Sequence, residues 1–183
     1  MIKTYLVTES AVDKAVFQYL LSDSITKSTK IVTAGGKSLA STILIMESLP
    51  VALVIDTDTF EKAAIKEQKE LSHKLLFQIS PSDVPFAVFT AIPQLEAVFL
   101  TDKALFEAKT QQQFSDSEWE FAKSQPKKFL LDVLGKRSLS IHQFLANLSE
   151  EEVNILRKHP LISELSEFLS KVINKKEDLL AAA

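Results

Sequence analysis

The sequence has no cysteine and only three glycines among its 183 residues. The absence of cysteine excludes disulfide frameworks, thiol nucleophiles and cysteine-ligated zinc. It also suits a reducing compartment, so we expect a cytoplasmic protein. No apolar run reaches membrane-spanning length, and the start of the chain enters a strand pattern directly. We therefore expect neither a membrane segment nor a secretory signal.

Neither sign of charge is in large excess, since 21 basic residues face 24 acidic ones and the net charge is −3. This balance gives no bulk attraction to nucleic acid, so any such binding must come from local basic patches. Candidate phosphate contacts are Lys37, the pair Lys127 and Lys128, and the pair Lys136 and Arg137. The three histidines lack metal-ligand spacing and are assigned no role.

The first half of the chain alternates between strand-like and helix-like patterns. Short apolar segments predict strands at residues 4–8, 30–34, 51–55 and 84–91. Amphipathic segments predict helices at residues 10–21, 39–46 and 59–76, with a short helix at 95–100. Right-handed βαβ crossovers turn this series into a parallel sheet covered by helices.

No strand-like run follows residue 101. Helical patterns recur instead at residues 116–124, 127–134, 139–146, 149–158 and 161–174. We therefore predict an α/β domain with a four-stranded parallel sheet (Rossmann-like) over residues 1–100, and an all-helical extension packed on it over residues 101–180. Residues 181–183, three alanines, could be a vector scar and are set aside.

Acidic residues follow three of the four predicted strands. Glu9 ends the first strand, Asp56 and Asp58 end the third, and Glu96 follows the fourth. The carboxyl ends of parallel strands meet at the edge where open α/β sheets bind ligands. If the first and third strands are neighbours, which predicts the strand order 2-1-3-4, these acids come together. Asp56 and Asp58 would point the same way on an extended chain. Gathered carboxylates suit a hard cation such as Mg²⁺ or Mn²⁺.

The same acids also have simpler structural interpretations. Asp13 lies four residues after Glu9, in the first turn of a helix that Ser10 can cap. It could face the space above the sheet, but acids in first turns commonly complement the helix dipole. Asp56 could cap the next helix, and Asp58 could be solvated. From the residues alone, both interpretations stay open.

A glycine pair, Gly35 and Gly36, follows the second predicted strand and permits close approach of a backbone or phosphate. Lys37 and Ser38 complete a Gly-Gly-Lys-Ser sequence. A P-loop would need a further glycine where this chain has Ile31, so we expect no nucleotide binding by that route.

A Glu after the first strand and an Asp-x-Asp after the third resemble the TOPRIM domain, which topoisomerases, bacterial primases and nucleases of the overcoming-lysogenisation-defect type share. The matching stretches are LVTES at residues 6–10 and VIDTD at 54–58. The spacing of Glu9 and Asp13 and the PQLE stretch at 93–96 are more similar to the nuclease branch. The resemblance covers about residues 3–100. One departure is Ser10, where many TOPRIM domains have glycine.

The resemblance implies a metal-dependent nuclease that cleaves phosphodiester bonds in nucleic acid, with DNA favoured over RNA. Glu9, Asp56 and Asp58 would be catalytic, and Glu9, Asp13, Asp56, Asp58 and Glu96 would hold Mg²⁺ or Mn²⁺. No topoisomerase tyrosine domain and no Walker motif are present in the sequence. The resemblance therefore implies no rejoining of DNA, but a separate ATPase partner, as in pairs that serve in phage defence. An oligomer is compatible with it.

Two other functions fit parts of the sequence. Asp56-Thr57-Asp58-Thr59 matches the start of a haloacid-dehalogenase phosphatase, in which the first Asp is a nucleophile and the second a general acid. That fold has this strand near its N-terminus, whereas two βα units precede it here. The second alternative is a non-catalytic interaction module that docks through its helical tail.

Overall fold

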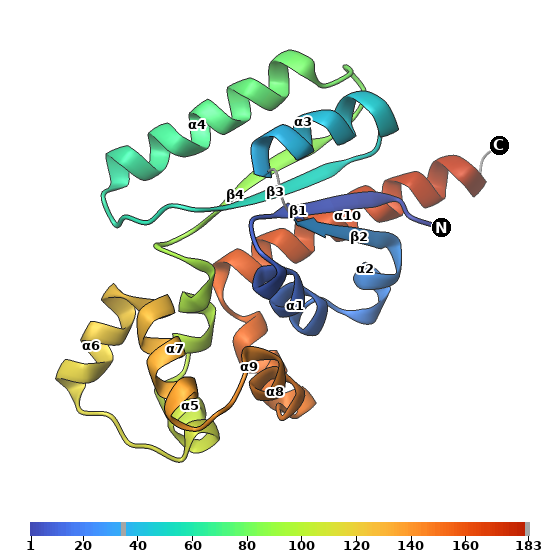
Figure 1. Ribbon diagram of the computed structural model, residues 1–183. Coiled ribbons are helices and arrows are strands. Elements are labelled where there is room, and N and C mark those ends of the chain that lie inside the picture. The colour runs from blue at the N-terminus through green and yellow to red at the C-terminus, as the bar shows by residue number, and fades with distance from the viewer. Residues whose placement is uncertain (34–35, 182–183) are drawn as a thin grey trace.

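A four-stranded, all-parallel sheet forms the centre of the computed structural model, which describes residues 1–33 and 36–181 (Figure 1). The strands are β1 (Thr4–Thr8), β2 (Thr29–Thr33), β3 (Val51–Asp56) and β4 (Phe86–Ala91). Their order is β2-β1-β3-β4, as the sequence predicts, and every neighbouring pair is parallel. Only helices follow β4 in the described chain. Fold class and strand order are thus confirmed, and the carboxyl ends of β1 and β3 lie side by side.

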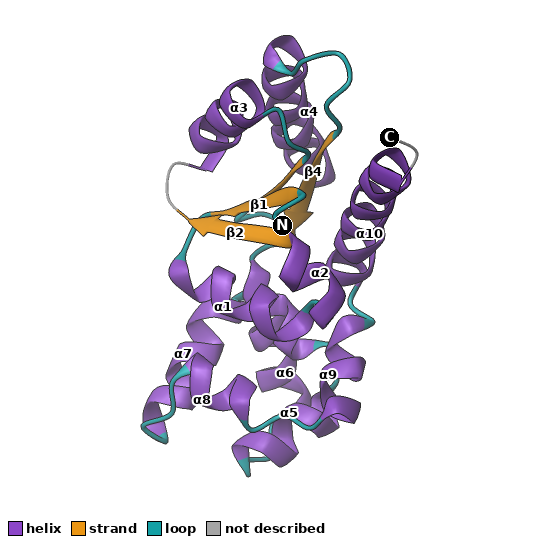
Figure 2. Ribbon diagram, turned by 90° about the vertical axis from the view of Figure 1, so that its right-hand side faces the viewer, coloured by secondary structure: helices purple, strands orange, loops and turns teal. Residues whose placement is uncertain are grey.

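Helices cover both faces of the sheet (Figure 2). One face carries α3 (Gly36–Glu47) and α4 (Lys62–Ile79), and the other carries α1 (Ala11–Leu20), α2 (Asp23–Ser28) and α10 (Pro160–Ala181). Between β4 and α10 the chain forms the 3-10 helix η1 (Leu95–Leu100), α5 (Lys103–Thr110), α6 (Asp116–Ser124), α7 (Pro126–Lys136), α8 (Ile141–Ala146) and α9 (Glu150–Arg157). No helix in the described ranges is long and apolar enough to cross a membrane.

Two hydrophobic cores lie on opposite sides of the sheet, because successive strand residues point to opposite faces. In β3, Leu53 joins the core under α3 and α4, whereas Val54 joins the core under α1 and α10. This second core continues without a break into the helical region, where it includes Phe106 and Phe144. The helical region is therefore fixed to the sheet by shared packing, and α10 returns from it along the sheet (Figure 1).

Several boundaries differ from the sequence prediction. Helices α2 and α5, of 6 and 8 residues, were not predicted. Helix α4 begins at Lys62, not at residue 59, because hydrogen bonds hold the residues before it in a loop. Strand β4 begins at Phe86 because Pro85 has no amide hydrogen for the ladder. Ala34 and Gly35, predicted as a strand end and a glycine turn, lie outside the described residues.

An aromatic cluster joins the helices of the region after β4. The ring of Phe106 in α5 lies 5.8 or 5.9 Å from four other rings, those of Phe114, Trp119, Phe129 and Phe144. These rings come from α6, α7, α8 and the loop before α6. Because Phe106 is fully buried, its side chain is the common contact through which these short helices pack.

We expect Phe106→Ala to lower the free energy of unfolding by about 3–5 kcal/mol, because it leaves a cavity between four rings. Urea denaturation measures the change. The matched control is Phe77→Ala on α4, whose side chain is 70% exposed and whose loss should cost within about 0.5 kcal/mol. Equal losses in the two variants would contradict this account of the core.

Candidate metal centre at the carboxyl edge of the sheet

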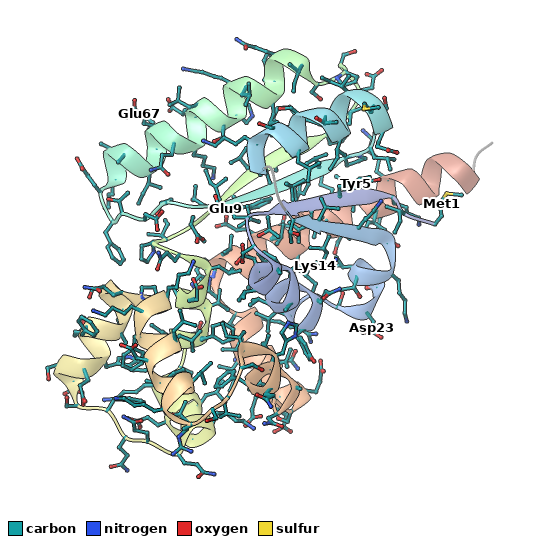
Figure 3. The ribbon with its side chains drawn as sticks, viewed as in Figure 1. Met1, Tyr5, Glu9, Lys14, Asp23 and Glu67 are labelled. Carbon is teal, nitrogen blue, oxygen red and sulfur yellow. The ribbon has the colours of Figure 1, made fainter. Side chains whose placement is uncertain are left out.

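The acids predicted from the sequence lie at one edge of the sheet. Glu9 directly follows β1, where Figure 3 labels it beside the start of α1. Asp56 is the last residue of β3, and Asp58 lies in the loop that follows. Glu96 is in η1, directly after the loop that leaves β4, and Asp13 is in the first turn of α1.

Asp13 fixes the start of α1. Its carboxylate accepts hydrogen bonds from the Thr8 hydroxyl at 2.8 Å, the Ser10 amide at 2.9 Å and the Ser10 hydroxyl at 2.6 Å. The Ser10 hydroxyl in turn accepts from the Asp13 amide, which completes a capping box and confirms Ser10 as the N-cap. Both oxygens of Asp13 are thus engaged by the protein, so this residue has the structural role that the sequence left open.

Thr57 ties the loop after β3 to the loop after β4. Its amide donates to the carbonyl oxygens of Ala91 and Pro93, at 3.1 and 3.0 Å, and the Asp58 amide donates to Pro93 at 2.8 Å. These bonds turn the chain, so that Asp58 has a left-handed φ of 51°, which aspartate tolerates better than most residues. The chain is therefore not extended there, and the expectation that Asp56 and Asp58 point the same way from an extended strand is wrong.

The segment after β4 supplies partners to both aspartates. The Leu95 amide donates to Asp56 Oδ1 at 3.0 Å, and Gln94 Nε2 donates to Asp58 Oδ1 at 2.8 Å. Glu96 is 5% exposed, and among the described residues its buried Oε2 has no hydrogen-bond partner. A buried carboxylate oxygen without a partner is costly, and a bound ion is one of the explanations for such a group. The roles of Thr57 and Gln94 were not predicted.

The gathered acids perturb one another. Burial raises the pKa of Asp56 to about 7, and the charges of Glu96, Asp13 and Glu9 act in the same direction. Burial also raises the pKa of Glu9, with Asp13 and Asp58 adding to it, and that of Glu96. Each acid thus lies close enough to influence others in the set, so the structure brings all five together. Acids whose pKa values are raised mainly by burial, with neighbouring charges adding to the shift, are typical of functional sites.

A cation would find only oxygen ligands here, which suits Mg²⁺ or Mn²⁺. Within the part of the chain that the structure describes, no three acidic or histidine side chains are placed to hold one ion together. The reason is geometric, since Asp13 is held in its capping box and Asp58 Oδ1 is paired with Gln94. Glu9 and Asp58 are exposed and can change rotamer, and Glu96 Oε2 is unpartnered. The donor set therefore fits the ion in chemistry, and binding would require the side chains of Glu9 and Asp58 to turn toward it.

A cavity of about 490 Å³ opens beside the acids. Asp58, Pro93 and Gln94 line one side of it, and the α6–α7 region lines the other with Lys127 and Lys128 among its residues. The charge of Lys127 lowers the pKa of both Glu9 and Glu96, which places this lysine near the acids. Of the predicted phosphate contacts, only this pair lines the cavity.

The remaining basic candidates lie elsewhere, as do two of the histidines, to which the sequence assigns no role. Lys37 is exposed on α3, Lys136 lines a different cavity, and Arg137 donates to the Gln111 carbonyl at 3.0 Å. His73 stacks on Phe77, and burial lowers the pKa of His159.

Comparisons with protein-family models, with curated proteins and with solved structures give no significant match.

The raised pKa of Asp56 predicts how stability changes with pH. Unfolded Asp56 titrates near 3.8 and folded Asp56 near 7, so between these values the folded state holds an extra proton. The free energy of unfolding should therefore fall as pH rises from about 4 to about 7. We expect Asp56→Asn, which keeps an oxygen to accept from the Leu95 amide, to raise the free energy of unfolding near pH 8 by about 1–2 kcal/mol. This is less than the full pKa shift would give, because the carboxylate is partly solvated.

Urea unfolding across this pH range, with Asp23→Asn on the exposed surface of α2 as the control, measures the effect. Loss of stability in Asp56→Asn near pH 8, or an unchanged pH dependence, would contradict the placement of Asp56 among the other acids.

Proposed function

We propose that the carboxyl edge of the sheet is the active site of a metal-dependent nuclease, which hydrolyses phosphodiester bonds in nucleic acid and favours DNA over RNA. The observation that carries this proposal is the gathering of five acids, including a buried glutamate with an unpartnered oxygen, beside a cavity lined by two lysines. The resemblance of LVTES and VIDTD to the TOPRIM nuclease branch supports it from the sequence.

The acids divide into ligands and supports. Glu9, Asp56 and Asp58 would hold the first ion, because the bonds from Leu95 and Gln94 engage Oδ1 of the two aspartates and Glu9 is exposed at the same edge. Glu96 would add its buried Oε2 to the ligand set. Asp13 would contribute charge rather than a direct bond, since its oxygens hold the start of α1. When bound, Mg²⁺ or Mn²⁺ supplies Lewis-acid activation and stabilises the leaving oxygen.

The lysines beside the acids supply the positive charge that binding of nucleic acid requires. A cluster of carboxylates and a net charge of −3 repel nucleic acid. Lys127 and Lys128 lie on the opposite wall of the cavity, where their ammonium groups can contact the phosphates on either side of the cleaved bond. The weak overall attraction also supports a further partner, which we propose is a separate ATPase, in keeping with the phage-defence role that the resemblance implies.

Nicking of supercoiled plasmid and cleavage of structured RNA in Mn²⁺ test the proposal. We expect Glu9→Gln and Asp56→Asn to lower the cleavage rate by at least about 100-fold. Loss of a residue that only supports a metal ligand lowers activity by about 10- to 100-fold, and loss of a ligand itself should lower it more. Asp23→Asn, a matched change at an exposed acid, should leave the rate unchanged.

The proposed ATPase enters the same assay as a second arm, and its addition should raise a weak basal rate. Cleavage that persists in Glu9→Gln and Asp56→Asn would refute the mechanism. Binding of a protein partner without any hydrolysis in the wild type would favour the interaction module.

A further inference from the structure

The wall of the cavity opposite the acids carries apolar as well as basic groups. Lys127 and Lys128 are exposed in the first turn of α7, and Leu131, one turn later, is 53% exposed. All three line the cavity of about 490 Å³ that reaches Asp58. Covering the exposed leucine side chain with an apolar ligand surface is favourable, and the two lysines beside it attract negative charge. The wall therefore suits a ligand with both an apolar and a negatively charged surface.

Phe121 in α6 extends this wall. Its side chain is 41% exposed, and Lys128 Nζ lies 5.9 Å from the centre of its ring. Phe121 lines a neighbouring cavity of about 290 Å³, and the two cavities adjoin at Asp132, which lines both. Figure 1 shows α6 and α7 side by side, next to the segment that leaves β4. The four residues Phe121, Lys127, Lys128 and Leu131 are called the stacking surface below.

We infer that the stacking surface binds an unpaired DNA strand and delivers its backbone to the acidic edge. The inference rests on the proposed function. Exposed aromatic side chains beside basic residues hold single strands, since a base stacks on a ring and the cations follow the backbone; here Phe121 supplies the ring. Phe121 and Leu131 would each take the face of a base, and Lys127 and Lys128 the phosphates between them.

A duplex fits the same surface poorly. Its base faces are hidden in the stack, so Phe121 and Leu131 would meet only sugars and phosphates. Asp58 and Asp132 also line the cavity and would repel additional phosphates, and among the described residues that line it Lys127 and Lys128 are the only basic ones. The apolar contacts that could offset this repulsion are available only from unstacked bases. The surface therefore favours unpaired nucleotides, such as those in a flap, gap or melted region.

Binding can be measured without cleavage by fluorescence anisotropy in EDTA, with a labelled oligothymidylate of about 15 nucleotides and a hairpin duplex of similar length. We expect the single strand to bind about tenfold more tightly than the duplex. Phe121→Ala should weaken single-strand binding about tenfold and leave duplex binding unchanged. Lys128→Gln should lower the slope of log affinity against log salt by about 1 for either probe.

Two matched controls lie on α4, on the other face of the sheet. Phe77→Ala removes another exposed ring and Lys74→Gln another exposed lysine, and both should bind the oligothymidylate as the wild type does. Phe121→Trp should retain binding, and its exposed indole should lose fluorescence when the strand binds. The native Trp119 is buried, so it should give little change in the wild type.

Equal affinity for single strand and duplex, or equal behaviour of Phe121→Ala and Phe77→Ala, would overturn the inference. Tighter binding of an oligouridylate than of the oligothymidylate would overturn its assignment to DNA. The proposed function fails separately: a wild type that binds the single strand selectively but never cleaves it in Mn²⁺ would refute the nuclease and leave the stacking surface intact.

Discussion

Burial of several carboxylates at one edge of a parallel sheet, with the repulsion between them, is the constraint on which the candidate site depends. Parallel strands bring their carboxyl ends together, so acids that follow β1, β3 and β4 must meet. Donors from the protein then stabilise their charges: the Leu95 amide on Asp56, Gln94 on Asp58, and the electrostatic effect of Lys127 on Glu9. These contacts do not restore the ordinary pKa of Asp56, because burial raises it to about 7.

Such an arrangement lowers stability and is expected where function requires it. Packing in the rest of the fold offsets this loss of stability, above all in the core that continues from the sheet into the helical region. That shared core also has a positional consequence, because α7 packs on η1 and so places Lys127 near the acids. The candidate site thus combines residues from both halves of the chain, and the helical region is more than a cover for the sheet.

The sequence predicts the sheet well because each strand is a short apolar run between clear helical segments. It also places Glu9, Asp56, Asp58 and Glu96 at one edge, since strand order alone determines that outcome. The details of the edge could not be predicted in the same way. Gln94 meets Asp58 across 36 residues of sequence, and Thr57 bonds to Ala91 across 34.

No local pattern encodes these long-range contacts, and the left-handed turn at Asp58 depends on them. Asp13 illustrates the opposite case. Its spacing to Ser10 is a capping-box pattern in the sequence, and the structure shows that this local interaction engages both of its oxygens. The sequence around Asp13 fits both a metal ligand and a helix cap. Only the hydrogen bonds in the structure show that its carboxylate caps α1.

The central claim is that the acidic edge holds a divalent cation. Anomalous diffraction from crystals soaked in Mn²⁺ tests it most directly, because the signal locates the ion without reference to activity. The account predicts a Mn²⁺ peak bounded by the carboxylates of Glu9, Asp56 and Asp58, with the side chains of Glu9 and Asp58 turned toward it. A wild-type crystal in which Mn²⁺ binds only elsewhere, or in which the edge stays free of it at saturating concentration, would contradict the claim.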